Sequence, residues 1–412
     1  MKKTLKQTDL KIYQALQGEI KRQKEGLELI ASENYVSKAV LEVLGSVFTN
    51  KYSEGYPGRR YYGGQEFTDK IEKLAIKRAK KLFQAQYVNV QPLSGAPANM
   101  IAYSAVLEPG DKILGMDLSH GGHLTHGHPA TLASKIYNFI SYKTEENGEI
   151  NYDKLEKLAL KEKPKLMLAG FSSYTRQIKY RRFTQIAKKI KAISMIDIAH
   201  IAGLIAGKAV SNPVPYFDIV TTTTHKTLRG PRGGMILAKK RFAQAIDKAT
   251  FPGFQGGPHM NNIAAKAVAF QEALSPSFRK YTQQILKNAK TLEQELKRKG
   301  FKIIFQKTEN HMLLVDVYNS KKITGKQAED TLDKIGITVN KNIIPNDLRS
   351  SLDPSGIRLG VPAITTRGMR EKEVKKIANW INIALENYKD KEKLNSLKKE
   401  VIKLCRKFPL PS

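Results

Sequence analysis

The stretch Val220–Gly234, VTTTTHKTLRGPRGG, sets one lysine between a run of β-branched residues and a glycine-rich turn. β-Branched runs are typical of strands, so Lys226 is expected where a buried strand ends. Loss of solvation there lowers the pKa of a lysine, and its amine can then form a Schiff base with a carbonyl compound. Most lysines are simply solvated, so a basic surface turn is the alternative. The neighbouring motifs decide between the two.

Asp197 interrupts an apolar, strand-like run, Ile193–His200, with the sequence ISMIDIAH. A lone carboxylate in such a run is costly unless it has a partner. Pyridoxal phosphate would offer its ring nitrogen, and an aspartate there keeps that nitrogen protonated so that the ring accepts electrons from a carbanion. Asp197 precedes Lys226 by 29 positions, about one strand–helix–strand unit, and reactive residues of α/β sheets gather at the carboxyl ends of strands. The alternative is a structural or helix-capping aspartate.

A candidate phosphate site follows the expected short strand Tyr87–Pro92. The segment Leu93–Asn99 is rich in small residues and precedes an expected helix from Met100 to Leu107. Small residues let the backbone approach a phosphate, and a helix N-terminus offers free N–H groups and a positive dipole end. The residues expected to contact the phosphate are Ser94, Gly95 and Ala96. Strand–glycine–helix turns are common, so this segment counts only together with the lysine and the aspartate.

The chain has 412 residues and a hydrophobic content of 41%, as expected for a globular protein with a large core and more than one domain. No apolar run approaches the roughly 20 residues that cross a membrane. The first residues are charged and lack the apolar core of a signal peptide. Cys405 is the only cysteine, so no internal disulfide can form. Together these features predict a cytoplasmic protein without a membrane span.

The formal net charge of +32 would suit a nucleic-acid-binding protein. The lysines are spread along the chain, however, and stretches such as Lys70–Lys81 alternate charged with apolar residues at helical spacing, as solvated helix faces do. No zinc-finger spacing or aromatic RNA-binding signature accompanies the charge. Nucleic-acid binding is therefore not expected, and it stays the alternative from a different functional class.

Strand-like and helix-like segments alternate up to about residue 270, which favours an α/β fold with a mostly parallel sheet covered by helices. We expect an N-terminal arm at residues 1–45 with a helix near Leu10–Lys24, a large cofactor-binding domain at 46–275, and a smaller C-terminal α+β domain at 276–412. A long helix is expected to begin near Asn262 and to lead into the small domain. The small domain should contain a strand at Met312–Val317 and two closing helices, near Glu371–Asn387 and Lys393–Lys407.

Five parts of the sequence carry a family resemblance: Leu27–Asn34, Asn50–Gly64, His120–Gly127, Asp197 with His200, and Thr221–Gly234. They resemble serine hydroxymethyltransferases, and the resemblance runs from about Leu27 to Phe408. Two of the motifs, Asn50–Gly64 and Thr221–Gly234, are over ten residues long. The resemblance implies the fold-type I architecture of pyridoxal phosphate enzymes, in which two identical subunits share their active sites.

The resemblance also implies a cofactor site. Lys226 would bind pyridoxal phosphate covalently, with Asp197 at the ring nitrogen and His225 shaping the site. His123 would stack on the ring, and His200 would hydrogen-bond the ring hydroxyl, unless it is a structural histidine. A His-Gly-Gly-His turn alone would suggest a metal, but no carboxylate or cysteine stands at ligand spacing, so no metal is expected. The remaining residues expected at the cofactor are Thr223 and, from the second subunit, Tyr52 and Gly257.

Arg358, within Ser355–Gly360, is expected to bind a substrate carboxylate. A planar guanidinium can donate two parallel hydrogen bonds to such a group. A surface arginine is the alternative, but the flanking glycines and apolar residues favour a recessed one. Arg232 is a weaker candidate for the electrostatics of the site. By resemblance, Ser32 and Tyr62 would also lie at the substrate.

Glu54 lies in a glycine-rich segment that is not expected to form regular structure. A partly buried carboxyl has a raised pKa and could move protons, whereas a solvated loop glutamate would not. The resemblance implies proton transfer at the hydroxymethyl group or the folate. The expected catalytic residues are Lys226, Glu54, His225, Asp197 and Tyr62, and the expected folate-binding residues are Glu54, Tyr61, Leu118, Gly122, His123, Leu124, Asn342, Ser350, Ser351 and Leu352.

The sequence departs from the family at Leu93, Phe254, Lys179 and Asp353–Pro354, and none of these changes removes an expected catalytic group. The resemblance implies reversible transfer of the hydroxymethyl carbon of serine to tetrahydrofolate, giving glycine and 5,10-methylenetetrahydrofolate. A threonine-type aldolase that uses pyridoxal phosphate without folate shares the lysine and the aspartate. It is therefore the alternative within the same chemistry.

Overall fold

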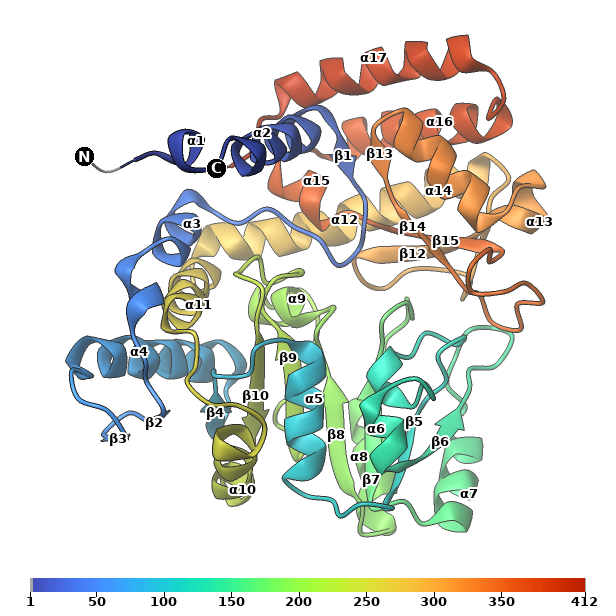
Figure 1. The fold of residues 1–412 in the computed structure, drawn as a ribbon. Coiled ribbons are helices and arrows are strands. Elements are labelled where there is room, and N and C mark those ends of the chain that lie inside the picture. Colours follow the sequence, from blue (N-terminus) through green and yellow to red (C-terminus); the bar gives the residue numbers. More distant parts are fainter. Residues whose placement is uncertain (1–2, 412) are drawn as a thin grey trace.

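A seven-stranded sheet organises residues 87–238 in the computed structural model, which describes residues 3–411 (Figure 1). Its strand order is β4-β10-β9-β8-β7-β5-β6. β10 runs antiparallel to both of its neighbours, and the other neighbouring pairs are parallel. The strands are β4 (Tyr87–Asn89), β5 (Lys112–Met116), β6 (Asn138–Tyr142), β7 (Leu166–Gly170), β8 (Ile193–Asp197), β9 (Ile219–Thr223) and β10 (Gly234–Ala238). The expected mostly parallel α/β sheet is confirmed.

Helices cover both faces of this sheet, because successive side chains of a strand point to opposite faces. Ile113 and Leu166 pack in one apolar core with α5 (Gly95–Ser104), α6 (Leu132–Ile136) and α10 (Ala243–Lys248). The adjacent residues Leu114 and Met167 pack in the other core. The helices on that side are α4 (Glu66–Phe83), α7 (Tyr152–Glu162), α8 (Tyr180–Lys189), α9 (Ala202–Ala206) and α11 (Met260–Ala273).

A four-stranded antiparallel sheet organises the C-terminal part of the chain, in the order β11-β12-β15-β14. Its strands are β11 (Lys302–Ile303), β12 (Met312–Asp316), β14 (Asn340–Asn342) and β15 (Gly356–Gly360). Helices α12 (Pro276–Arg298), α14 (Gly325–Lys334), α16 (Glu371–Glu386) and α17 (Lys391–Lys407) accompany this sheet (Figure 1). The strand near Met312 and the two closing helices were expected from the sequence, and both expectations are confirmed.

The N-terminal segment is joined to the C-terminal part of the chain. After α1 (Leu5–Thr8) and α2 (Leu10–Glu25), β1 (Leu27–Glu28) pairs in parallel with β13 (Ile337–Thr338). The next elements, α3 (Lys38–Leu44) and the 3-10 turn η1 (Val47–Asn50), lead back towards α11 and α4 (Figure 1). The limits of the three expected domains, at residues 45 and 275, stay a prediction.

Two local expectations are wrong. The helix expected from Met100 begins at Gly95 and ends at Ser104, because the small residues after Ser94 already take the first helical turn. The segment around Glu54, expected to be irregular, contains a small hairpin of β2 (Gly55–Tyr56) and β3 (Arg59–Arg60). Its turn uses Gly58 at φ +80°, a conformation that costs glycine little.

Short elements complete the chain. They are the 3-10 turns η2 (Leu124–His126) and η3 (Lys240–Phe242), the irregular turn η4 (Ala249–Phe254), and helices α13 (Val317–Lys321) and α15 (Pro362–Thr366). Within residues 3–411, no helix combines the length and the apolar character needed to cross a membrane.

Candidate active site

Lys226 lies just beyond β9, in the loop that leads to β10, and only 9% of its surface is exposed. Burial lowers the pKa of its amine to about 8, against the opposing charge of Asp197. Its backbone carbonyl accepts a hydrogen bond from Asn34 Nδ2 (3.0 Å), which ties the N-terminal segment to this loop. The amine itself makes no hydrogen bond or ion pair among residues 3–411. Lys226 is thus a buried amine that no other residue among 3–411 contacts by a polar interaction, so it can react with a ligand.

Asp197 ends the neighbouring strand β8 and is also buried. Its Oδ1 accepts from the N–H of Ala199 (2.9 Å), and its Oδ2 accepts from Asn99 Nδ2 (2.9 Å) and faces His126 Nε2 (3.4 Å). Burial acts to raise the pKa of Asp197, but the hydrogen bonds and charges of these partners outweigh it and hold the pKa well below its usual range. The carboxylate is therefore ionised, as a partner for a ring nitrogen must be.

His123 stands beside this carboxylate in a network of short polar contacts. Its Nδ1 faces Thr125 Oγ1 (2.8 Å), which in turn accepts from Asn99 Nδ2 (2.8 Å). The rings of His123 and His126 lie edge to face with centroids 5.6 Å apart. Burial lowers the pKa of His123 to about 4, so that its ring is neutral near pH 7. A neutral, flat ring fixed in this way is able to stack on a planar ligand.

His200 and His311 form a second buried pair. Nδ1 of His200 lies 3.3 Å from Nε2 of His311, and the rings stack at 5.4 Å with an angle of 20° between their planes. Burial lowers the pKa of His311 to about 3 and that of His200 well below its usual range. Sequence reasoning did not identify His311, because it lies just before β12 of the other sheet, far from His200 in the sequence.

Arg358 is recessed in the middle of β15, as its flanking residues predicted. Its NH1 donates to the carbonyl of Ser172 (2.7 Å), and its Nε donates to Asn340 Oδ1 (3.1 Å). It forms no ion pair with an acid among residues 3–411, and burial lowers its pKa to about 10. A buried guanidinium without a counter-ion is suited to an anionic substrate group.

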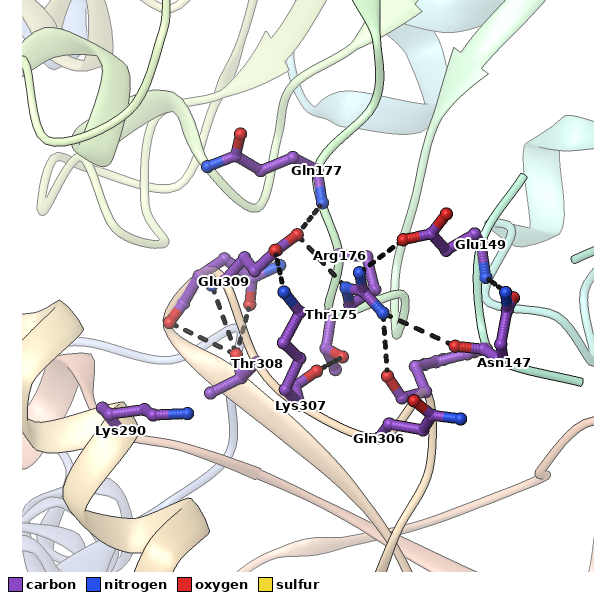
Figure 2. Close-up of polar contacts among 12 residues, drawn as sticks. Asn147, Glu149, Thr175, Arg176, Gln177, Lys290, Gln306, Lys307, Thr308 and Glu309 are labelled. Carbon is purple, nitrogen blue, oxygen red and sulfur yellow. Dashed lines mark hydrogen bonds and ion pairs between the residues drawn. The ribbon is translucent and has the colours of Figure 1, made fainter. Parts of the chain in front are cut away.

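The loop after β7, which carries Ser172, continues into Thr175–Gln177. Polar contacts join these residues to Lys307–Glu309, which precede β12 (Figure 2). Arg176 pairs with Glu149 (2.8 Å) and Glu309 (3.2 Å). Glu309 N donates to the Thr175 carbonyl (2.8 Å), and Thr175 Oγ1 donates to the Lys307 carbonyl (2.7 Å). We call this set, Thr175, Arg176, Lys307 and Glu309, the Arg176 clasp. It links the loop that carries Ser172 to the residues that lead into His311.

The loop around Lys226 also holds His225 and Arg232. The N–H of Gly233 donates to His225 Nδ1 (3.4 Å), and burial lowers the pKa of His225 to about 3. Arg232 is exposed at the end of the same loop. Ser32 lies on the segment after β1, where Gly360 N donates to the Leu29 carbonyl (2.7 Å), so it borders the strand of Arg358.

The candidate phosphate loop, Ser94–Ala96, starts α5 beside the two strands that flank Lys226. A Cβ atom on Gly95 would come within 2.8 Å of Thr223 Cγ2, and one on Gly234 would overlap the Ser94 carbonyl. These close approaches require glycine at both positions. Thr223, Ser94 and Gly95 therefore lie together, as expected for residues that contact one phosphate.

A separate group of expected site residues gathers at the β2–β3 hairpin. The rings of Tyr52 and Tyr62 lie 5.2 Å apart, a Cβ on Gly257 would be 3.4 Å from the Tyr52 ring, and Glu54 raises the pKa of Tyr52. Tyr61 stacks edge to face with Phe251 (5.4 Å) and is 73% exposed. No hydrogen bond or ion pair among residues 3–411 joins this group to Lys226, Asp197 or Arg358. Within one chain, the expected site residues therefore form two separate groups.

The expected folate residues come from two places in the fold. Leu118, Gly122 and Leu124 lie in the loop after β5, and Asn342 ends β14. Ser350, Ser351 and Leu352 lie in the following loop, where Leu352 is largely exposed. Gly122 packs so closely on the Met116 carbonyl that a Cβ would overlap it. No hydrogen bond or ion pair among the described residues joins these two loops.

Several residues of the site were missed by sequence reasoning: Asn34, Asn99, Thr125, His126, Ser172 and His311. Asn99 and His126 contact Asp197 directly, and both stand within stretches that the sequence had already singled out. The polar residues of those stretches were the available signal. Ser172 and His311 carried no such signal, because their partners lie far away in the sequence.

The comparison with known families agrees with this geometry. The family model described as serine hydroxymethyltransferase matches residues 5–381 of the 412. The match includes the lysine loop, the aspartate strand, the β2–β3 hairpin and the strand of Arg358. With the buried lysine, the ionised aspartate and this match over most of its length, the chain belongs to the serine hydroxymethyltransferase family.

Proposed function

We propose that Lys226 is the residue to which this enzyme binds its pyridoxal phosphate. As a member of its family, the protein is a pyridoxal phosphate-dependent transferase that interconverts serine and glycine with tetrahydrofolate, giving 5,10-methylenetetrahydrofolate. The observation that carries the proposal is a buried amine with a pKa lowered to about 8, without a partner among residues 3–411. A lowered pKa leaves more of the amine unprotonated near neutral pH, and the unprotonated amine is the form that attacks an aldehyde.

The surroundings of Lys226 fit the cofactor. Asp197 would hold the ring nitrogen in its protonated form, because its own pKa is kept low. When bound, the cofactor supplies an electron-accepting ring. His123 would stack on that ring, His200 would bind its hydroxyl, and His225 would shape the pocket. The phosphate would be held by Ser94, Gly95, Ala96 and Thr223, together with Tyr52 and Gly257 of the partner subunit.

Arg358 would bind the carboxylate of serine or glycine. Its hydrogen bonds to the carbonyl and Oγ of Ser172 and to Asn340 involve NH1 and Nε, and they leave NH2 for the substrate. Holding the carboxylate orients the substrate and fixes which of its bonds breaks. Ser32 would add a contact to the same group, and Tyr62 and Arg232 would border it.

Glu54 would move the proton at the hydroxymethyl group or the folate. The folate would lie against Tyr61, Leu118, Gly122, His123, Leu124 and Asn342 and the loop Ser350–Leu352. Because the hairpin group is separate from Lys226 within one chain, we place it in the site of a second copy. Exposed apolar side chains around the hairpin, among them Tyr61, Val47 and Phe67, support a homodimer in which they are covered. A cytoplasmic location is consistent with the single buried Cys405.

Borohydride trapping tests the proposal. The purified enzyme is reduced with bound pyridoxal phosphate, digested, and the labelled peptide is identified by mass spectrometry. The label is expected on Lys226, and Lys226→Ala should lose both the label and folate-dependent turnover. A label on another lysine would refute the proposal. Serine cleavage at the same rate with and without tetrahydrofolate would instead favour a threonine-type aldolase, which no observation favours at present.

A further inference from the structure

Lys266, in the middle of α11, is a buried cation that the proposed reaction does not use. Only 1% of it is exposed, and burial lowers its pKa to about 7, opposed by the charge of Glu72. Glu72 is itself paired with Arg60 (2.5 Å) and makes no ion pair with Lys266. A buried ammonium group is costly unless other groups compensate its charge.

The compensation comes from three backbone carbonyls. Nζ of Lys266 donates to Val90 (2.7 Å), Gly234 (2.8 Å) and Pro92 (3.1 Å). An ammonium group has three N–H donors, so all of them are used. Val90 and Pro92 lie between β4 and the phosphate loop, and Gly234 begins β10. Lys266 therefore ties the residues before Ser94 to the end of the loop that carries Lys226.

The ammonium group lies directly behind both loops. A Cβ on Gly233 would come within 2.5 Å of Lys266 Cε, and a Cβ on Gly234 would overlap the Ser94 carbonyl. The N–H of Gly234 also donates to the Pro92 carbonyl (2.9 Å). Lys266, Gly234 and Ser94 thus form consecutive layers, with the candidate phosphate loop outermost.

We propose that Lys266 is a positioning residue for the cofactor phosphate, whose buried charge holds the phosphate loop in place and attracts the dianion. This inference rests on the proposed binding of pyridoxal phosphate at Ser94–Ala96. The carbonyl dipoles and the carboxylate of Glu72, which is already paired with Arg60, leave the charge of the ammonium only partly compensated. A bound phosphate would supply a further negative charge across a single layer of backbone. In a poorly solvated interior, the attraction between the ammonium and a phosphate remains strong even when the two groups are not in direct contact.

The test compares two ligands that differ only in the phosphate. Apo-protein is titrated with pyridoxal phosphate and with pyridoxal, and binding is followed by the visible absorbance of the lysine-bound cofactor. Lys266→Met is expected to bind pyridoxal phosphate about tenfold more weakly, with pyridoxal affinity nearly unchanged, because only the phosphate senses the lost charge. Lys280→Met, the same substitution at an exposed position of α12, is the matched control and should leave both affinities unchanged.

A second variant separates charge from hydrogen bonding. Lys266→Gln keeps donors for the carbonyls without a charge, and it is expected to show the same phosphate-selective loss. An equal loss for both ligands, wild-type affinity, recovery in the glutamine variant, or failure of both variants to fold would overturn the proposal and leave Lys266 a purely structural residue. Failure of wild-type protein to absorb after addition of either ligand would instead refute the assignment of Lys226.

Discussion

His126 donates a hydrogen bond to Asp197 at the buried end of β8. Its Nδ1 accepts the backbone N–H of His123 (3.2 Å), and its Nε2 lies 3.4 Å from Asp197 Oδ2. A neutral imidazole that accepts at Nδ1 carries its proton at Nε2, so the ring faces the carboxylate as a donor. The neighbouring histidine thus helps to keep Asp197 ionised.

Replacement of His126 should weaken this ionisation. His126→Phe is expected to lower kcat/KM about tenfold, since a hydrogen bond to a charged group contributes about 1.5 kcal/mol. The acidic limb of the pH–rate profile should move to higher pH, because the pKa of Asp197 rises when a donor is lost. The control is His128→Phe, two residues further on and partly exposed. Equal profiles for the two variants would contradict the role of His126.

Arg358→Lys should separate geometry from charge. The lysine keeps the positive charge, but it cannot make the two parallel hydrogen bonds of a guanidinium. We expect kcat/KM for serine to fall on the order of 100-fold, because the parallel hydrogen bonds of the guanidinium to the charged carboxylate are lost, at a cost of about 1.5 to 3 kcal/mol each. Steady-state kinetics with serine as the varied substrate would check this. A wild-type KM would show that the carboxylate binds elsewhere.

The Arg176 clasp should affect substrate binding from a distance. Glu309→Gln weakens the contacts of Glu309 with Arg176 and with the N–H of Gln177 (2.9 Å). We expect a loss of about 1 to 3 kcal/mol in the free energy of unfolding and a higher KM for serine, because the Ser172 loop holds Arg358. Glu149→Gln weakens the other ion pair of Arg176. The side chain of Glu149 is 51% exposed, so this variant should have a smaller effect. Urea unfolding and KM measurements on both variants test the difference, and equal effects would count against the clasp.

Acid should destabilise the fold through its buried histidines. The pKa of His123 is lowered to about 4 and that of His311 to about 3, whereas an unfolded histidine titrates near about 6.5. Between these values the unfolded chain binds protons that the folded chain does not, so stability is complete above about pH 6.5 and falls as the pH decreases towards 4. Urea unfolding at several pH values should show this slope. In His311→Phe the slope should be shallower by up to about 1.4 kcal/mol per pH unit, and an unchanged slope would contradict the assignment.

Hybrid dimers test whether two chains share each site. Lys226→Ala and Glu54→Ala should each be inactive alone. After mixing under conditions that exchange subunits, a hybrid dimer has one site with both defects and one with none, so it should recover about half of the wild-type activity. Absence of any recovery, with exchange verified by mass, would place Lys226 and Glu54 in the same chain's site.

The sequence was most informative where local pattern decides structure. The β-branched run before Lys226 and the apolar run around Asp197 both form buried strands, and both residues stand at the carboxyl ends of those strands. The mostly parallel sheet and the two helices that close the chain followed from the same kind of pattern, whereas the order of the strands in the sheet was not predicted. The start of α5 was harder to judge, because Gly95 has poor helix propensity and the short run of small residues after Ser94 shows no apolar periodicity.

The contacts between distant segments could not be predicted. Asn34 reaches Lys226, and His311 stacks on His200, only because the two sheets meet at this point. No spacing within one strand or helix encodes such a meeting. Lys266 was likewise indistinguishable in the sequence from the many exposed lysines of this basic chain.

The reversed direction of β10 has a consequence for the reactive lysine. Two parallel strands need a long crossover between them, whereas antiparallel neighbours are joined directly. Thr223 and Gly234 are opposite one another in the β9–β10 ladder, so residues 224–233 leave the sheet and return to it at the same level. Lys226 therefore lies in a short loop whose two ends are held by paired strands. Its amine stays close to Asp197 while it exchanges one bound partner for another.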